Sequence, residues 1–186
     1  MIFTNSLIEL QSVLEKSAKI EQEINIFYQS IKKAFEANKK LYICGNGGSA
    51  SDAQHFAAEI VGRFERSRPG CPAIALNTDT SILTAISNDY GFQNIYSRQI
   101  QALGKEGDIL LAISTSGNSQ NIINAVNEAN QIGLYTIALT GNSGGAIKNI
   151  VDLPIMVPSN RTCRIQEVHI FILHIICELL DNQNIK

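Results

Sequence analysis

Apolar side chains follow two different periods along the chain. From residue 5 to residue 38 they recur every three or four positions, with no Pro or Gly between them. This period predicts one long helix, or two helices joined near residues 16–19. So much apolar helix surface ahead of the first strand needs a partner, which the sheet or another subunit can supply.

Beyond residue 40, short apolar runs alternate with helical patterns. The apolar runs predict strands at residues 41–44, 72–76, 108–113, 134–139 and 151–157. The helical patterns predict helices at residues 51–64, 80–86, 95–103, 119–131 and 164–181. Thr80 is the candidate cap of the second of these helices, and residues 141–145 open a short helical turn. Alternation of this kind is typical of α/β proteins, in which helices cover both faces of a parallel sheet.

The predicted fold class is therefore α/β: a three-layer αβα sandwich with a five-stranded parallel sheet, preceded by a long N-terminal helical segment. We find no repeat, low-complexity tract or linker in the sequence. The chain is accordingly interpreted as a single domain over residues 1–186, with the helical segment at 1–38 and the α/β core at 39–186. Sheets of this type bind ligands beyond the carboxyl ends of their strands.

Residues 114–119, Ser-Thr-Ser-Gly-Asn-Ser, directly follow the third predicted strand and precede a helix. Ser114, Thr115, Ser116 and Ser119 place four hydroxyls beside the N-terminus of that helix. Backbone N–H groups and the positive helix end attract an anion, and hydroxyls add hydrogen bonds to its charged oxygens. The stretch therefore predicts a phosphate site. The ordinary alternative, a helix capped by Ser119, needs one hydroxyl rather than four.

A second glycine-rich turn, Gly45-Asn46-Gly47-Gly48-Ser49, follows the first predicted strand. It does not match Gly-x-Gly-x-x-Gly, and no Lys follows it as in a P-loop, so it gives little support to a nucleotide site. Adjacent glycines allow the backbone to approach a ligand closely. A tight strand–helix turn explains them equally well.

Two predicted helices carry candidate catalytic or metal-ligating groups. His55 and Glu59 are four residues apart and share one helix face. They form either an ordinary surface pair or a site for proton transfer or metal binding. The last predicted helix is apolar nearly all round, which indicates burial on most sides.

Within that last helix, His174 lies in an apolar run, so its imidazole needs either a core partner or a task. Gln166 comes eight residues earlier, about 80° round an ideal helix, so the two side chains can reach one site. By spacing alone, Glu167 and His169 are alternatives.

The composition narrows the functional classes. A net charge of −2 over 186 residues gives no global basic field, which argues against a nucleic acid partner. The short basic stretch at 63–68 is interpreted as a solvated loop. No apolar run reaches the length of a membrane span, and the N-terminus lacks a signal-peptide pattern. Four cysteines without C-x-x-C spacing indicate reduced thiols, so we expect a cytoplasmic protein with no membrane partner.

From about residue 31 to the C-terminus, the motifs described above resemble the phosphoheptose isomerases of the sugar isomerase (SIS) family. Each motif alone is weak, but their order along the chain makes the resemblance specific. Further matching stretches are Arg68-Pro-Gly70, Asn88-Asp89, residues 107–111, residues 139–141 and Arg164-Ile-Gln-Glu167.

The resemblance implies the SIS fold with a flavodoxin-like strand order, in a cytoplasmic homotetramer with sites at subunit interfaces. It implies interconversion of sedoheptulose 7-phosphate and D-glycero-D-manno-heptose 7-phosphate, which opens nucleotide-activated heptose synthesis for lipopolysaccharide or capsule. It also implies that Glu59 and His174 are catalytic. The implied zinc ligands are His55, Glu59, Gln166 and His174. The implied substrate-binding residues are Asn46, Gly47, Gly48, Glu59, Asn88, Asp89, Ser114, Thr115, Ser116, Ser119 and Gln166.

This chemistry agrees with the residue types. An aldose–ketose isomerisation moves a proton between C1 and C2 through an enediolate, so it needs a base beside the carbon and an acid on the oxygens. A carboxylate and an imidazole suffice, and a divalent metal can polarise the carbonyl. The sequence leaves open which of Glu59 and His174 removes the carbon-bound proton.

Two alternatives belong to the same family. One is a non-catalytic SIS module that associates with the bacterial replication initiator, which resembles this chain strongly at residues 73–79 and 164–167. That relative looks unlike this chain at Glu59, Ser116 and His174, so the enzyme is favoured. The other is a different sugar-phosphate enzyme of the SIS family, such as a hexose-phosphate isomerase or an etherase. The spacing between Gln166 and His174 argues against it.

Overall fold

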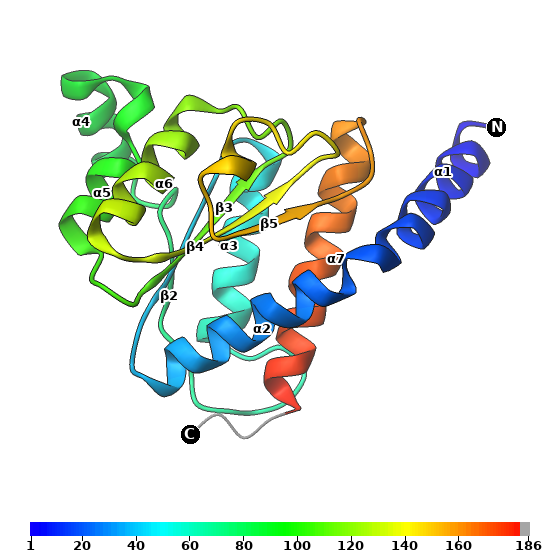
Figure 1. The fold of residues 1–186 in the computed structure, drawn as a ribbon, viewed down its shortest axis with the longest axis horizontal. Helices are drawn as coiled ribbons and strands as arrows, with labels where there is room; N and C mark the ends of the chain where they lie inside the picture. The colour runs from blue at the N-terminus through cyan, green and yellow to red at the C-terminus, as the bar shows by residue number, and fades with distance from the viewer. Residues whose placement is uncertain (183–186) are drawn as a thin grey trace.

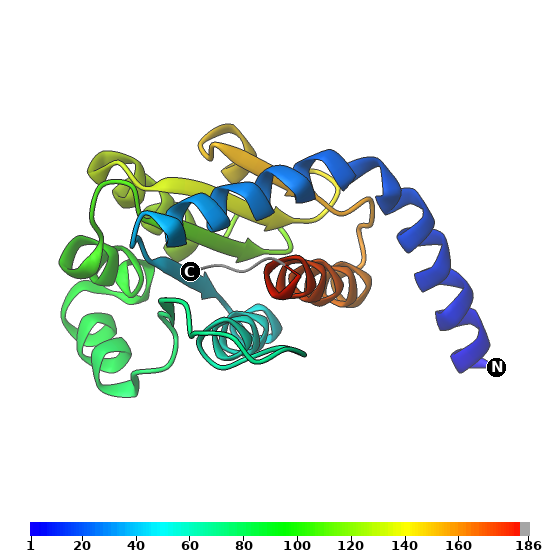
Figure 2. The same cartoon turned by 90° about the horizontal axis from the view of Figure 1, so that it is seen from below.

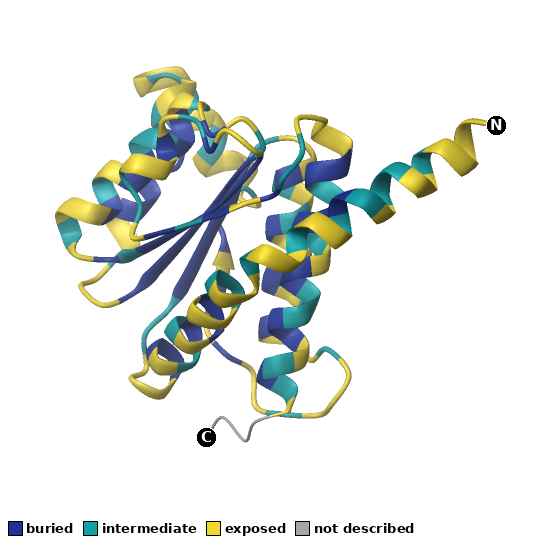
Figure 3. Ribbon diagram, turned by 45° about the vertical axis from the view of Figure 1, so that its right-hand side comes forward, coloured by how far each residue is buried: buried dark blue, intermediate teal, exposed yellow. Residues whose placement is uncertain are grey.

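The N-terminal segment forms two helices in a computed structural model that describes residues 1–182. Helix α1 (Ile2–Ser17) and helix α2 (Glu21–Glu36) are joined by a 3₁₀ turn, η1 (Ala18–Ile20). This is the second of the two predicted arrangements. Helix α2 buries Phe27 and Ile31, whereas α1 extends away from the body with mostly exposed side chains (Figures 1 and 3).

Five parallel strands form one sheet in the order β2-β1-β3-β4-β5. Their bounds are β1 (Leu41–Gly45), β2 (Ala73–Ala75), β3 (Ile109–Ser114), β4 (Tyr135–Thr140) and β5 (Leu153–Met156). The central strands β1 and β3 are buried along their whole length, as expected for a sheet covered on both faces. The predicted parallel sheet and its flavodoxin-like order are confirmed.

Helices cover both faces of this sheet, and alternate strand residues point to opposite layers. Ile43 and Leu111 belong to a core shared with α2, α3 (Gly48–Val61) and α7 (Thr162–Asp181). Tyr42 and Leu110 belong to a second core on the other face. That face packs against α4 (Thr80–Tyr90), η2 (Phe92–Asn94), α5 (Ser97–Leu103), α6 (Gln120–Ile132) and η3 (Ile147–Asn149). The three-layer sandwich is therefore confirmed (Figure 2).

Several predicted helix boundaries were wrong, mainly because of turn chemistry. Helix α3 begins at Gly48 rather than residue 51, directly after Gly47 with φ +56°. The cap of α4 is Asp79 rather than Thr80, since Asp79 Oδ1 accepts a hydrogen bond from Ile82 N–H at 2.9 Å. The short helical turn predicted to open at residues 141–145 is present as η3, which follows the glycines of that stretch.

Helices α3 and α7 lie side by side on one face of the sheet and run in the same direction (Figures 1 and 2). Near their beginnings, a Cβ on Gly48 would lie 2.5 Å from Nε2 of Gln166. Further along, His55 contacts His174, 119 positions later in the chain. Over residues 1–182, no helix is long and apolar enough to cross a membrane.

Candidate active site

The serine loop, residues 114–119, is held in place by backbone contacts with the turn at 141–145. Gly117 has φ +65°, and a Cβ on it would lie 2.1 Å from the carbonyl oxygen of Gly144. Only glycine fits such an approach. Asn118 adds a tie, because its Oδ1 accepts a hydrogen bond from Ala146 N–H at 2.9 Å. Backbone packing and the side chain of Asn118 therefore hold the loop against this turn.

Ser119 occupies the N-cap position of α6, but its side chain makes no capping hydrogen bond. Its Oγ instead accepts a hydrogen bond from Ser114 Oγ at 3.3 Å. The ordinary alternative, in which the loop serves to cap a helix, is therefore not what the structure contains. A cavity of about 250 Å³ lies beside the loop, lined by Thr115, Ser116, Asn118, Asn142, Ser159 and Thr162.

The glycine-rich turn after β1 is joined to the serine-loop side of the sheet by an amide pair. Asn46 and Asn121 exchange two hydrogen bonds, each 2.9 Å from Nδ2 to Oδ1. Asn121 is buried near the start of α6. Sequence analysis missed Asn121, because its partner lies 75 positions away and no local pattern marks the pair. This reciprocal pair fixes the amide of Asn46 at the carboxyl edge of the sheet.

His55, Glu59 and His174 lie together between α3 and α7. Glu59 Oε1 is 3.3 Å from His55 Nε2, and His174 Nε2 is 3.5 Å from the same nitrogen. The side chain of His55 is 47% exposed and that of Glu59 is 25% exposed, so ligands can reach both. The i,i+4 pair therefore exists, but a third group from another helix completes it, which an ordinary surface pair lacks.

Gln166 lies beside the first residue of α3, nearer the start of both helices than this cluster. Its amide occupies the space that a side chain on Gly48 would need. Gly48 is therefore required for Gln166 to sit against the glycine-rich turn. From Gln166 to His174 the helix rises about 12 Å. Helix α7 therefore runs from the glycine-rich turn, where it places Gln166, to the His55 cluster, where it places His174.

The last helix carries one core histidine, and it is His169. Its side chain is fully buried, with Nε2 3.2 Å from the carbonyl oxygen of Thr140. Nδ1 is buried without a hydrogen-bond partner among the described residues. His174, by contrast, is only partly buried. The reading of His174 as a core histidine was therefore wrong, as was His169 as an alternative site residue.

Protonation of His169 gives a testable dependence of stability on pH. Burial lowers the pKa of His169 from 6.5 to about 4, although its bond to Thr140 opposes the shift. Between pH 6.5 and about 4, His169 is therefore protonated in the unfolded chain but not in the folded chain. The free energy of unfolding should fall by on the order of 3 kcal/mol between roughly pH 6.5 and 4, and this contribution should not fall further below pH 4.

Urea titrations at a series of pH values measure this slope. His169→Gln keeps an amide donor for the Thr140 carbonyl but does not titrate, so its unfolding free energy should lose that part of the slope. An equal slope in both proteins would assign the acid sensitivity to other groups.

Asn88 and Asp89 are not brought to the His55 cluster within one chain. Both are exposed at the end of α4, in the helix layer on the opposite face of the sheet from α3 and α7. Asn88 Nδ2 donates a hydrogen bond to Asp89 Oδ1 at 2.8 Å. Within one chain they therefore cannot share a ligand with the α3–α7 cluster.

The basic stretch at 63–68 differs from the predicted solvated loop at one residue. Arg63 and Arg66 are exposed, but the side chain of Arg68 is only 8% exposed and pairs with Asp181. Sequence analysis missed this contact, because Asp181 lies 113 positions further along the chain.

The separations between the donor atoms of the cluster are those of ligands on one divalent metal ion. Two ligands of a tetrahedral zinc ion, each about 2.0–2.1 Å from the metal, lie roughly 3.3–3.4 Å apart. The separations from His55 Nε2, 3.3 Å to Glu59 and 3.5 Å to His174, match this spacing. In the part of the chain that the structure describes, however, no three His, Cys, Asp or Glu side chains form a metal-holding group. The donor pairs at His55 fit a metal, whereas the Gln166 amide, which would complete the ligand set, lies against Gly48.

A three-layer sandwich with a hydroxyl-rich loop at the carboxyl edge of its sheet defines an SIS-domain protein, and residues 3–141 match the SIS domain family model. The phosphoheptose isomerase of Trichlorobacter lovleyi is 51% identical over 177 residues, covering 93% of this chain and 90% of that protein. The phosphoheptose isomerase of Aliarcobacter butzleri is 50% identical over 174 residues, covering 94% and 87%. This chain belongs to the phosphoheptose isomerase family.

Solved structures agree with this assignment. The phosphoheptose isomerase from Neisseria gonorrhoeae superposes with a TM-score of 0.92 at 42% identity, over 97% of both chains. The one from Francisella tularensis gives a TM-score of 0.94 at 39% identity, again over 97% of both chains. The predicted family, the SIS fold and the class of enzyme, an isomerase, are confirmed. The alternative of a non-catalytic SIS module is not favoured.

Proposed function

We propose that this protein interconverts sedoheptulose 7-phosphate and D-glycero-D-manno-heptose 7-phosphate through an enediolate. The observation that carries the proposal is the grouping of His55 and Glu59 of α3 with His174 of α7. The first turn of α7 lines the cavity beside the serine loop. Relatives of about 50% identity that are named phosphoheptose isomerases support it. The reaction would supply heptose for lipopolysaccharide or capsule, in the cytoplasm.

The geometry suits a long sugar that carries its phosphate and its carbonyl at opposite ends. The serine loop binds the phosphate in this proposal, through Ser114, Thr115, Ser116 and Ser119. Thr115 and Ser116 line a cavity that the N-terminal turn of α7 also lines. The His55 cluster lies further along the same helix, so the reacting carbons are held away from the phosphate.

Proton transfer falls to Glu59 and His174. The carboxylate and the imidazole converge on His55 Nε2 from two helices, so both can reach one small ligand. One group removes the proton from the carbon, and the other donates a proton to the neighbouring oxygen. Both groups are exposed enough to exchange protons with solvent between turnovers. Asn46, Gly47, Gly48 and Gln166 line the edge of the sheet, where they would bind the sugar hydroxyls.

We further propose a zinc ion at His55, Glu59, Gln166 and His174. Two imidazoles and a carboxylate are suitable zinc donors, while an amide oxygen suggests a modest affinity. When bound, the ion would supply a positive charge that polarises the carbonyl and stabilises the enediolate.

Removal of the metal gives a test. Dialysis against a chelator should lower activity, and added zinc should restore it, while elemental analysis should find one zinc per chain before dialysis. His55→Ala should reduce the zinc content, because it removes the nitrogen that lies within 3.5 Å of both Glu59 and His174. Activity indifferent to chelator and to added zinc, in a protein without metal, would remove the ion from the mechanism.

We propose a homotetramer, because apolar surface remains uncovered in the single chain. Helix α1 exposes Ile2, Phe3, Leu7 and Ile8, and Phe171 of α7 is 51% exposed. An apolar groove of about 360 Å³ lies between these helices, lined by Leu14, Ile20, Ile24, Phe171, Ile175 and Leu179. Packing of neighbouring subunits there would place Asn88 and Asp89 of one chain at the site of another.

Sedimentation should give about four times the 20.3 kDa chain mass at micromolar concentration. Phe171→Asp places a charge on the exposed face of α7 and should reduce that mass. A stable wild-type monomer would contradict the assembly.

The decisive experiment for the function is an assay of purified protein with sedoheptulose 7-phosphate. Formation of the heptose 7-phosphate aldose supports the proposal, and hexose and pentose phosphates tested in parallel identify another SIS sugar-phosphate activity. Absence of isomerisation with every sugar phosphate would overturn it.

A further inference from the structure

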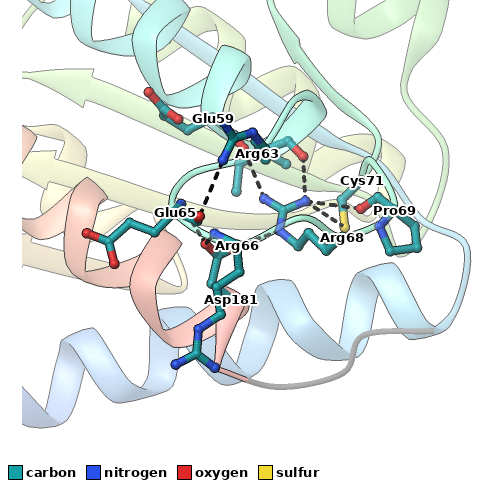
Figure 4. Close-up of polar contacts among 9 residues, drawn as sticks. Glu59, Arg63, Glu65, Arg66, Arg68, Pro69, Cys71 and Asp181 are labelled. Carbon is teal, nitrogen blue, oxygen red and sulfur yellow. Dashed lines mark hydrogen bonds and ion pairs between the residues drawn. The ribbon is translucent and has the colours of Figure 1, made fainter.

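Arg68 forms a fork of hydrogen bonds at the end of α3 (Figure 4). Its Nη2 donates to the carbonyl oxygen of Glu59 at 2.9 Å, and its Nη1 donates to the carbonyl oxygen of Ile60 at 2.9 Å and to that of Pro69 at 3.1 Å. The last carbonyls of a helix have no partner within the helix. The guanidinium therefore supplies both hydrogen bonds and a positive charge where α3 needs them.

The same guanidinium joins α3 to the end of α7. Arg68 Nε donates to Asp181 Oδ1 at 2.9 Å. The other carboxylate oxygen of Asp181 accepts hydrogen bonds from the backbone N–H groups of Glu65 and Arg66, each at 2.8 Å. Asp181 is thus bonded on both oxygens, and its side chain is only 3% exposed. We call this pair, Arg68 with Asp181, the clasp.

Bonding from both sides keeps the clasp ionised. Burial alone would raise the pKa of Asp181, but the backbone hydrogen bonds of Arg66 and Glu65, together with Arg68, hold it below its ordinary value. A buried pair in which one member is removed leaves an uncompensated charge. In the clasp, each charge is compensated by directed hydrogen bonds from the other helix or its loop.

The clasp is the third contact along a single seam between the two helices. The first contact is Gly48 with Gln166, and the second is His55 with His174. The clasp closes the seam at the end of α3, where Arg68 bonds the Glu59 carbonyl, and two turns beyond His174 on α7. Most other residues buried along this seam are apolar, and their attraction is non-directional, whereas the clasp supplies directed hydrogen bonds.

The loop that the clasp holds also touches the candidate catalytic imidazole. Phe64 directly precedes Glu65, whose backbone N–H is bonded to Asp181. The Phe64 ring lies over His174, with centroids 5.4 Å apart and planes 32° apart. The imidazole of His174 also meets that of His55 edge-on, with centroids 5.0 Å apart. His174 thus contacts both a ring that the clasp positions and a ring on the helix that the clasp caps.

We propose that Arg68 and Asp181 are positioning residues, which set α3 against α7 and Phe64 against His174 so that Glu59 and His174 face one substrate. Neither residue touches substrate in this role, and the inference rests on the proposed function for its kinetic part. The serine loop lies at the other end of α7, so the clasp should act on the chemical step rather than on phosphate binding.

Arg68→Met and Asp181→Asn test the clasp from its two sides. Asp181→Asn keeps an oxygen for the two backbone N–H groups and breaks only the contact with Arg68. Both variants should lower kcat by about 10- to 100-fold, because small misplacement of reacting groups has effects of this size. KM should change by less than about threefold, since phosphate binding is untouched. Arg68→Lys keeps the charge but not the fork, so it should not restore kcat.

Asp108→Asn is the matched control. Asp108 is also buried and also accepts two backbone N–H groups, from Lys40 at 2.9 Å and Lys105 at 3.0 Å, at the opposite edge of the sheet. It should destabilise the fold while leaving kcat unchanged, which separates positioning from general stability. A clasp variant that folds, melts like the control and keeps wild-type kcat would overturn the proposal.

Histidine NMR spectra give a readout that does not depend on activity. The chain has three histidines, so the signals of His55, His169 and His174 can be assigned. The clasp variants should move the imidazole signals of His55 and His174 and leave that of the core residue His169 in place. If the wild type isomerises no sugar phosphate, the proposed function fails, and this pattern still decides the clasp. Unmoved His55 and His174 signals, or equal movement of all three, would overturn it.

Discussion

The double substitution Ser116→Ala, Ser119→Ala is expected to raise KM for the sugar phosphate by about 10²-fold or more. Loss of a hydrogen bond to a charged group costs roughly 1.5–3 kcal/mol, and each 1.4 kcal/mol is a factor of ten. Both hydroxyls belong to the loop proposed to bind phosphate, and Ser119 does not use its side chain to cap α6. The substitution should therefore act on binding.

The fold should survive this change, because backbone contacts hold the loop. Gly117 packs on Gly144, and Asn118 is bonded to Ala146. Ser30→Ala provides a control, since Ser30 lies away from the site and its Oγ donates to a carbonyl of its own helix, that of Ile26. Steady-state kinetics and a thermal melt of all three proteins decide the matter. A double variant with an unchanged KM would reject the phosphate assignment.

The layers of the fold were predictable because they depend on local patterns. Apolar runs such as 41–44 and 108–113 marked the buried strands, and the run of hydroxyls at 114–119 marked the strand end where an anion is attracted. The same reasoning failed at helix starts, where one cap decides the boundary. Asp79 rather than Thr80 caps α4, and the positive φ of Gly47 allows α3 to begin three residues early.

The site was less predictable, because it depends on which side of a helix faces which neighbour. His169 and His174 are five residues apart on α7 and both lie among apolar residues, yet the first is in the core and the second meets α3. Five residues turn an ideal helix by about 140°, so one pattern cannot bury both. Only the packing of α7 against β4 and α3 separates them.

Contacts between distant parts of the chain carry no local signal at all. In the sequence, Arg68 is one of several charged residues in a loop, and only the structure shows that it pairs with Asp181. Likewise, the sequence places Asn121 in a helix, and only the structure shows its pairing with Asn46. Both pairs join elements that become neighbours only after the sheet has formed.

The largest effect is expected from the proton-transfer pair. Glu59→Gln keeps the size of the side chain and removes the base, and His174→Gln removes the imidazole. General acid–base groups contribute typically 10²–10⁴-fold to rate, so each variant should lose at least about that much. Glu178→Gln is the matched control, because it makes the same change at an exposed position of α7. Metal content must be measured in every variant, since Glu59 and His174 are also proposed zinc ligands.

The route of the proton distinguishes an isomerase from a binding module. If Glu59 and His174 transfer protons through an enediolate, the wild type in deuterated water should introduce deuterium at C1 or C2 of the sugar during turnover. Both variants should still bind sugar phosphate, because the serine loop is a separate part of the chain. Wild-type rates in both variants would mean that other residues perform the chemistry. A wild type that neither isomerises nor labels any sugar phosphate, but binds a protein partner, would make this chain a binding module on an enzyme fold.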